Sequence, residues 1–136
     1  YGWAKGAYEL LAFLLATGKV DGRALEIVQW RIGGPRDDDI DQVKPGDIPV
    51  MHRALGAYLS RRDQVQQAIR MVETEDIRDA RGIPFQIIYG ISGNTHRFWS
   101  IANAREVIGY APQDDSQVSF ADKIATIARA AKKDHA

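Results

Sequence analysis

The chain has 136 residues, and its 18 basic and 18 acidic side chains give a formal net charge of zero. This balance argues against a nucleic-acid or membrane-surface role, which usually shows as a basic excess. Cysteine is absent, which excludes disulfides, thiol catalysis and cysteine-ligated zinc. The longest apolar stretch, Leu10–Ala16, is too short to span a bilayer, and no segment resembles a signal peptide.

The first predicted element is an apolar helix over residues 2–18, followed by a strand over 25–32. Apolar residues recur at helical spacing before Gly18, a candidate C-terminal stop: Ala4, Ala7, Tyr8, Leu11, Phe13, Leu14 and Leu15. The apolar face is wide, so we expect this helix to be buried on more than one side. The strand, LEIVQWRI, is short and β-branched and leads into Gly33-Gly34-Pro35.

A long irregular loop is predicted over residues 34–48. It contains a run of acidic residues, Asp37, Asp38, Asp39 and Asp41. Irregular segments of this length are usually functional or mobile. We interpret the acidic run as a solvated loop and expect no metal site, because no His or Glu supports one.

Three helices and one strand are predicted in the second half. A helix over 61–74 has Ser60 as its candidate N-cap, and a strand covers 84–92. Ser100 is a candidate cap for a short helix that runs to Val107 and ends at Gly109. The last helix, FADKIATIARAAKK, is amphipathic.

This order predicts an α/β fold with parallel strands. Two parallel strands cannot bury so many apolar helix faces, since small sheets are marginal alone and parallel sheets need several strands. The sequence therefore calls for more sheet than it contains, and it does not begin with Met. We expect residues 1–136 to be the C-terminal part of a larger α/β unit whose N-terminal half is absent.

The first five residues, YGWAK, combine a tyrosine and a lysine that share one face of a helix. An ammonium near a phenol favours the phenolate, and so does the positive end of a helix. A tyrosine in this setting could exchange a proton with a substrate hydroxyl near neutral pH. Alone, the spacing is common by chance.

The context of this pair resembles one family. YGWAKGAYELLAFLLA resembles the catalytic helix of the extended short-chain dehydrogenase/reductases, also called the NAD-dependent epimerase/dehydratase family. IVQWRIGGP resembles the strand after that helix, and HRALGAYLSRRDQVQQAIR resembles the loop and helix that follow. IIYGISGNTHRFWSIANAREVIGYAPQDDS is most similar to uronate dehydrogenases and related sugar dehydrogenases. Matching elements extend from Tyr1 to about Ser116.

The resemblance implies a role for five residues. Tyr1 would be the general acid/base, and Lys5 would bind the nicotinamide ribose and favour the Tyr1 phenolate. Ile32 would contact the nicotinamide side of the cofactor. Gly34 falls where uronate dehydrogenases have a serine that touches substrate, and glycine offers no hydroxyl. Arg53 falls on the arginine that binds a substrate carboxylate, and a guanidinium suits that group.

The resemblance also implies the wider function. It predicts the C-terminal part of a Rossmann-type sheet with flanking helices and a small substrate-binding region. The complete enzyme would be a cytoplasmic homodimer or other homo-oligomer that oxidises a sugar or sugar acid with NAD or NADP. One alternative is a nucleotide-sugar epimerase or dehydratase that keeps its cofactor bound. Another is a non-catalytic dinucleotide-binding regulator. The apolar helix face could be covered by the missing half or by a second subunit.

Two family features are missing from the sequence. There is no glycine-rich dinucleotide turn between a strand and a helix, and the catalytic serine upstream of the tyrosine is absent. We therefore predict that the 136 residues alone have no dehydrogenase activity.

The histidines do not form a metal-binding pattern in the sequence. His96 and Arg97 are expected in a capping loop packed by Phe98 and Trp99, and His52 and His135 show no metal spacing with His96.

Overall fold

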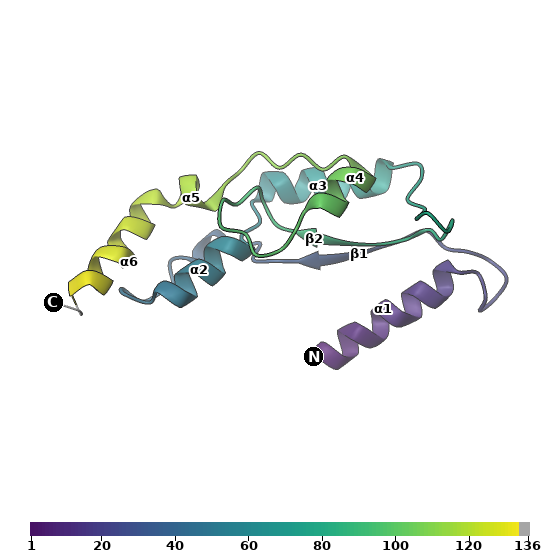
Figure 1. Cartoon of the computed structure of the whole chain (residues 1–136), viewed down its shortest axis with the longest axis horizontal. Helices are drawn as coiled ribbons and strands as arrows, with labels where there is room; N and C mark the ends of the chain where they lie inside the picture. Colours follow the sequence, from purple (N-terminus) through teal and green to yellow (C-terminus); the bar gives the residue numbers. More distant parts are fainter. Residues whose placement is uncertain (134–136) are drawn as a thin grey trace.

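The chain folds around a two-stranded parallel sheet with helices on both faces. The computed structural model describes residues 1–133, so His135 lies outside the described residues. Strand β1 (Ile27–Ile32) pairs with β2 (Phe85–Gly90), from Ile27 opposite Phe85 to Ile32 opposite Gly90. Helix α1 (Gly2–Ala16) lies on one face, and α3 (Arg61–Glu73) and α4 (Ala102–Ile108) lie on the other (Figure 1). The predicted α/β class with parallel strands is confirmed.

Helix α1 is far less buried than its composition predicts. It contacts the sheet through residues such as Phe13, whose ring meets Phe85 edge to face at 5.4 Å between centroids. Only Ala12 and Ala16 are fully buried, and Leu10 is 63% exposed. The expectation that α1 is buried on more than one side is wrong within the described chain, because a two-stranded sheet is too narrow to cover it. The predicted stop is confirmed, since Gly18 has φ 69° just after the helix.

The opposite face of the sheet holds one apolar core. Ile88 of β2 packs with three buried residues of α4 and the following turn, Ala104, Ile108 and Tyr110. Trp30 of β1 borders this core, and its indole N–H donates to the Gln67 amide oxygen of α3 at 2.8 Å. Gly90 is required here, because a Cβ would come within 2.4 Å of the Trp30 ring nitrogen.

A second core lies beyond the carboxyl ends of the strands. Helix α2 (Ile48–Ala57) packs against α6 (Ala121–Lys133), with buried residues that include Ile40, Val43, Met51, Leu55 and Ile127. The predicted loop over 34–48 contains a short 3-10 turn, Asp37–Asp39, before α2 begins. Helix α2 is not among the predicted elements. Pro49 and Gly56 look like helix breakers, but proline is tolerated in a first turn, and Asp47 caps the helix by accepting from the Val50 amide at 3.2 Å.

The remaining predicted elements agree with the structure apart from their ends. Ser60 is the N-cap of α3, as predicted, and Gly109 ends α4 with φ 64°. Ile101, rather than Ser100, is the N-cap of α4, although the Ser100 hydroxyl accepts from the Ala102 amide at 3.2 Å. A further short helix, α5 (Ser116–Ser119), precedes α6. Within residues 1–133, no helix combines the length and the apolar character needed to cross a bilayer.

Candidate active site at the end of the first strand

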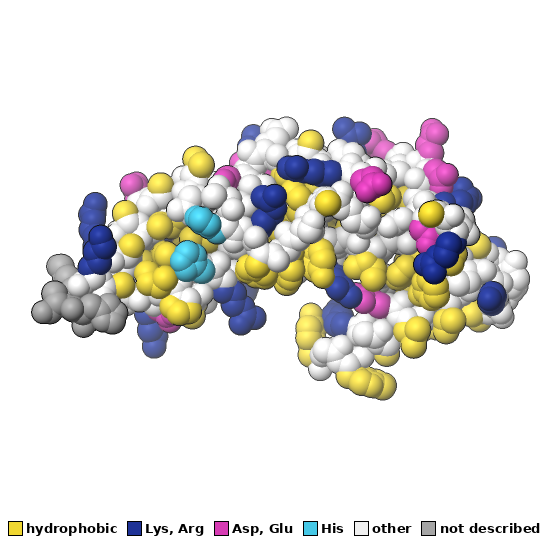
Figure 2. Space-filling model, in the orientation of Figure 1, with side chains coloured by type: hydrophobic (Ala, Val, Ile, Leu, Met, Phe, Trp, Pro, Cys, Tyr) yellow, Lys and Arg dark blue, Asp and Glu magenta, His cyan; other side chains and the backbone are white. Residues whose placement is uncertain are grey.

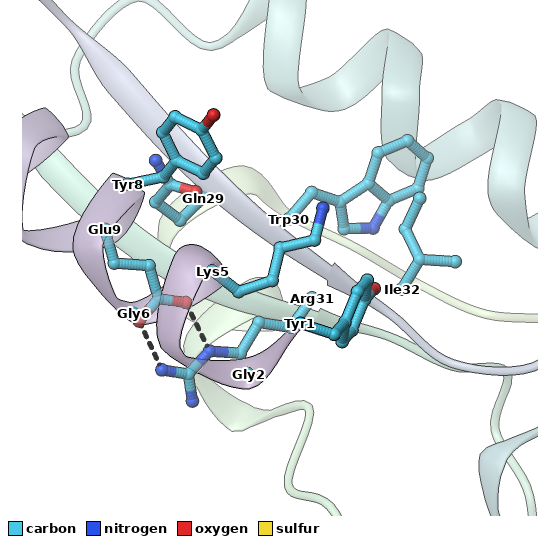
Figure 3. A pocket seen from close by; sticks show the side chains of 10 residues that line it. All are labelled: Tyr1, Gly2, Lys5, Gly6, Tyr8, Glu9, Gln29, Trp30, Arg31 and Ile32. Carbon is cyan, nitrogen blue, oxygen red and sulfur yellow. Dashed lines mark hydrogen bonds and ion pairs between the residues drawn. The ribbon is translucent and has the colours of Figure 1, made fainter.

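Tyr1 and Lys5 lie at the amino end of α1, beside the carboxyl half of β1 (Figure 3). The Lys5 amide donates to the Tyr1 carbonyl at 3.1 Å, and the Lys5 ammonium lies 5.3 Å from the centre of the Tyr1 ring. Both residues line a cavity of about 640 Å³ between α1 and β1, here called the first hollow, together with Trp30 and Ile32. Tyr1 is 98% exposed, so a substrate can reach its hydroxyl.

An ion pair connects α1 to the sheet at the first hollow. Arg31 of β1 donates to both oxygens of Glu9, at 2.7 and 2.6 Å, and to the Tyr89 hydroxyl of β2 at 2.9 Å. The hydrogen bonds from Arg31 lower the pKa of the Glu9 carboxyl, and those to Glu9 and Tyr89 raise the pKa of Arg31. These bonds therefore connect α1, β1 and β2 on the Tyr1 side of the sheet.

Ile32 also lines a second cavity, of about 880 Å³, here called the second hollow. Gly34 and Arg53 line this cavity as well. The five residues implicated by the sequence therefore divide between two cavities that share Ile32: Tyr1 and Lys5 on one side, Gly34 and Arg53 on the other.

Backbone hydrogen bonds join the end of β1 to the end of α2. The Gly34 amide donates to the Ala57 carbonyl at 2.7 Å, and the Leu59 amide donates to the Gly34 carbonyl at 3.0 Å. Glycine at position 33 allows the end of β1 to approach the end of α2, because a Cβ there would lie 2.1 Å from the Ala57 carbonyl oxygen. This junction holds α2, and with it Arg53, beside the carboxyl end of β1.

Arg53 is an exposed cation next to an aromatic wall. No ion pair within residues 1–133 involves its guanidinium. Phe98 and Trp99 line the same hollow. Trp99 stacks on Tyr89 at 5.1 Å, and Phe98 meets Trp99 edge to face at 4.9 Å. The second hollow therefore combines apolar ring surface with the positive charge of Arg53 and the carboxylate of Asp39, and the Arg53 part of it suits the anionic group of a ligand that also has an apolar face.

The polar motifs that carry the family resemblance form a buried structural network. Asp63 is fully buried and accepts from the backbone amides of Gln113 and Asp114 at 2.8 and 3.1 Å. The Ser60 hydroxyl donates to Asp114 at 2.6 Å, and Arg62 also donates to this carboxylate. These bonds, from Ser60 first and Arg62 second, lower the pKa of Asp114. Within the described residues every buried polar side chain has a partner, so the network holds α3 to the 113–116 segment.

The two described histidines lie together on the surface, away from Tyr1. The rings of His52 and His96 meet edge to face at 6.0 Å, and Figure 2 shows them among hydrophobic side chains. Among residues 1–133, no three His, Asp or Glu side chains are grouped so that they could hold a metal ion. Arg97 donates to the Asn94 carbonyl at 3.1 Å within its own loop.

The structure adds residues to the candidate site that the sequence does not single out. Asp39 and Gln42 of the predicted loop, and Phe98 and Trp99, line the second hollow with Gly34 and Arg53. Asp39 belongs to the acidic run interpreted as solvated, and no local pattern separates it from Asp37 or Asp38. Asp39 differs from its neighbours only because the loop folds back to the end of β1 and places it beside Gly34.

Comparison with known proteins gives one partial similarity. No protein-family model matches the chain, and no solved structure matches it. A segment of 32 residues is 53% identical to the NAD-dependent glucose-6-phosphate dehydrogenase of Haloferax volcanii. The match covers 24% of this chain and 12% of that enzyme, so only a small part of the relative is represented.

Proposed function

We propose that residues 1–136 are the C-terminal part of a Rossmann-type domain in an NAD-dependent oxidoreductase that oxidises a sugar or sugar acid. One observation carries the proposal: the hollow with Tyr1 and Lys5 and the hollow with Arg53 share Ile32 at the carboxyl end of β1. Ligands of open parallel sheets bind at this end of the strands. The partial similarity to an NAD-dependent sugar-phosphate dehydrogenase supports the same class.

The residues of the first hollow fit one end of the cofactor. Lys5 can donate to ribose hydroxyls, and Ile32, 42% exposed, offers apolar surface to a nicotinamide ring. The sequence has no glycine-rich turn for the pyrophosphate. When bound, NAD supplies the hydride acceptor for the substrate carbon that carries the reacting hydroxyl. NADP would need the same contacts at this end.

Tyr1 and Arg53 would have separate tasks in the reaction. The Tyr1 oxygen, as phenolate, accepts the hydroxyl proton as the C–H hydride leaves and the C–O bond becomes a carbonyl. The Lys5 ammonium, 5.3 Å from the centre of the Tyr1 ring, would place a positive charge beside that group. Arg53 binds a carboxylate or phosphate of the sugar and holds the reacting hydroxyl toward Tyr1. The exposed side of α1 would be covered in the complete enzyme, by its N-terminal half or by a second copy.

The test uses the longer protein that this proposal implies. Tyr1→Phe should lower kcat by about 10²- to 10⁴-fold, the usual contribution of a positioned acid/base group, and leave NAD affinity within about 2-fold. The measurement is NADH formation with glucose 6-phosphate, glucuronate and glucose, together with NAD binding by calorimetry. Net accumulation of NADH also separates a dehydrogenase from an epimerase.

Tyr8→Phe is the matched control, because Tyr8 lines the same hollow from the next turns of α1 and is 65% exposed. It should retain wild-type kcat. Wild-type turnover in Tyr1→Phe would remove the acid/base assignment, and NAD binding without turnover on a broad sugar panel would favour a regulator.

A further inference from the structure

The Asp39 carboxylate lies beside Gly34, at the end of β1, where a side chain on residue 34 would begin. If Gly34 carried a Cβ, that atom would lie 3.0 Å from Oδ2 of Asp39. The Asp39 carboxylate thus lies where a side chain of residue 34 would project into the second hollow. Its other oxygen, Oδ1, forms an ion pair with the Arg36 guanidinium at 3.1 Å, and the side chain is 29% exposed. The Gly34 side of this carboxylate is available to a ligand in the hollow.

The loop that carries Asp39 is anchored to the body of the protein. The Tyr58 hydroxyl donates to Asp37 at 2.8 Å, and Tyr58 itself is only 8% exposed. Tyr58 follows α2 directly, at the junction between that helix and Gly34. This bond holds the 3-10 turn at the rim of the second hollow, and the Arg36 ion pair, which lies within the same loop, constrains the Asp39 carboxylate locally.

The chemistry of the hollow fits a polyhydroxylated ligand with an anionic group. A carboxylate is an acceptor-only group, and sugar hydroxyls are the matching donors. Phe98 and Trp99 offer ring surface in the same hollow, and Arg53 supplies a positive charge. Because one cavity holds both a carboxylate and a guanidinium, a ligand with an anionic group can bind in only one favourable orientation. Asp39 repels the anionic group, and Arg53 attracts it.

The geometry points to Asp39 as a specificity-determining residue of the substrate site, which accepts a hydrogen bond from a sugar hydroxyl and directs the sugar's anionic group to Arg53. This inference rests on the proposed sugar substrate but deepens it. Asp39 supplies, from the 34–48 loop, the polar oxygen that Gly34 cannot supply from the strand.

The first experiment compares Asp39→Ala with Asp38→Ala in the longer protein. Asp38 is the exposed neighbour in the same turn and does not line the hollow. Asp39→Ala should raise the sugar KM about 10-fold and leave kcat and the NAD KM within about 2-fold, because it removes a binding contact and no reacting group. Asp38→Ala should match the wild type. Equal sugar KM values in the two variants overturn the inference.

A second experiment identifies the hydroxyl. A panel of monodeoxy analogues of the best substrate is assayed with the wild type and with Asp39→Ala. The wild type should discriminate against one analogue about 10-fold in kcat/KM, since an acceptor left without its donor is costly. Asp39→Ala should lose discrimination against that same analogue. Unchanged discrimination in Asp39→Ala overturns the role of Asp39.

A binding measurement separates this inference from the proposed reaction. Saturation-transfer NMR with glucose 6-phosphate and glucuronate is recorded with NADH present, which prevents oxidation. Sugar binding that is weakened by Asp39→Ala, in a protein that does not reduce NAD, supports the subsite and overturns the proposed activity. The absence of sugar binding in the wild type overturns both.

Discussion

Gly33 and Gly34, which follow β1, differ in how much space a side chain would have at each position. A Cβ on Gly33 would lie 2.1 Å from a backbone oxygen, that of Ala57, and 2.9 Å from a methyl of Ile91. A Cβ on Gly34 would lie 3.0 Å from the end of the Asp39 side chain and 3.7 Å, an ordinary van der Waals distance, from the Ala57 carbonyl oxygen. Neither glycine has a positive φ, so the difference between them is purely one of space.

Gly33→Ala should therefore destabilise the fold much more than Gly34→Ala. We expect Gly33→Ala to lower the free energy of unfolding by about 1–3 kcal/mol, the usual cost of overpacking, since backbone must move. Gly34→Ala should cost under about 1 kcal/mol, because the end of the Asp39 side chain need shift by only a few tenths of an ångström and no backbone must move. Urea unfolding of the two variants and the wild type measures this, and equal losses would contradict the close approach of β1 to α2.

At the scale of elements, α3 is tied to the segment after α4 by charge as well as by packing. Asp114 accepts from the Ser60 hydroxyl, which is also the N-cap of α3, and from Arg62 in the first turn. The pKa of Asp114 is lowered in the folded protein, so its carboxylate stabilises the fold above the unfolded pKa of about 3.9. That contribution is lost as the pH falls through the folded pKa.

Asp114→Asn tests this linkage. The variant should unfold with about 1–2 kcal/mol less free energy than the wild type at pH 7, and the gap should shrink as the pH falls below about 4. Urea unfolding across that pH range is the measurement. Asp38→Asn, at an exposed carboxylate, should match the wild type at every pH. A gap for Asp114→Asn that is independent of pH would assign its loss to packing.

The sequence predicts the elements whose signal is local and misses those set by distant contacts. Helical periodicity and a capping serine locate α3, and short runs rich in β-branched residues locate both strands. Helix α2 escapes prediction, because its proline and glycine resemble loop residues and its stability comes from packing Met51 and Leu55 against α6. The candidate site divides in the same way: Tyr1 and Lys5 are recognisable by spacing, whereas Asp39 reaches the second hollow, beside Gly34 and Arg53, only through the path of the loop.

At the scale of the whole molecule, apolar side chains of α1 are exposed to solvent in the described residues. On α1, Trp3 is 87% exposed, Tyr8 65% and Leu10 63%, and hydrophobic side chains show along this helix in Figure 2. Monomeric proteins rarely expose such continuous apolar surface. In addition, β1 pairs only with β2 within residues 1–133, so its other edge has free backbone donors and acceptors.

The same architecture predicts that the 136-residue polypeptide by itself does not reduce NAD. The proposed reaction needs the nicotinamide held against Tyr1, and in Rossmann-type domains the backbone donors of a glycine-rich turn at a helix N-terminus bind the pyrophosphate of the dinucleotide. The sequence contains no such turn, and in the proposed function Lys5 and Ile32 would contact one end of the cofactor at most. The measurement is NADH formation by the polypeptide with the sugar panel, beside the longer protein under identical conditions.

A folding control makes that result interpretable. The polypeptide should show a cooperative thermal transition by circular dichroism, because two cores and the Asp63 network lie within the described residues. If the polypeptide is folded but inactive while the longer protein is active, the polypeptide lacks activity because it lacks the remaining cofactor contacts. NADH accumulation by the polypeptide that Tyr1→Phe abolishes would show instead that residues 1–136 bind NAD unaided, and the proposed division between two halves would fall.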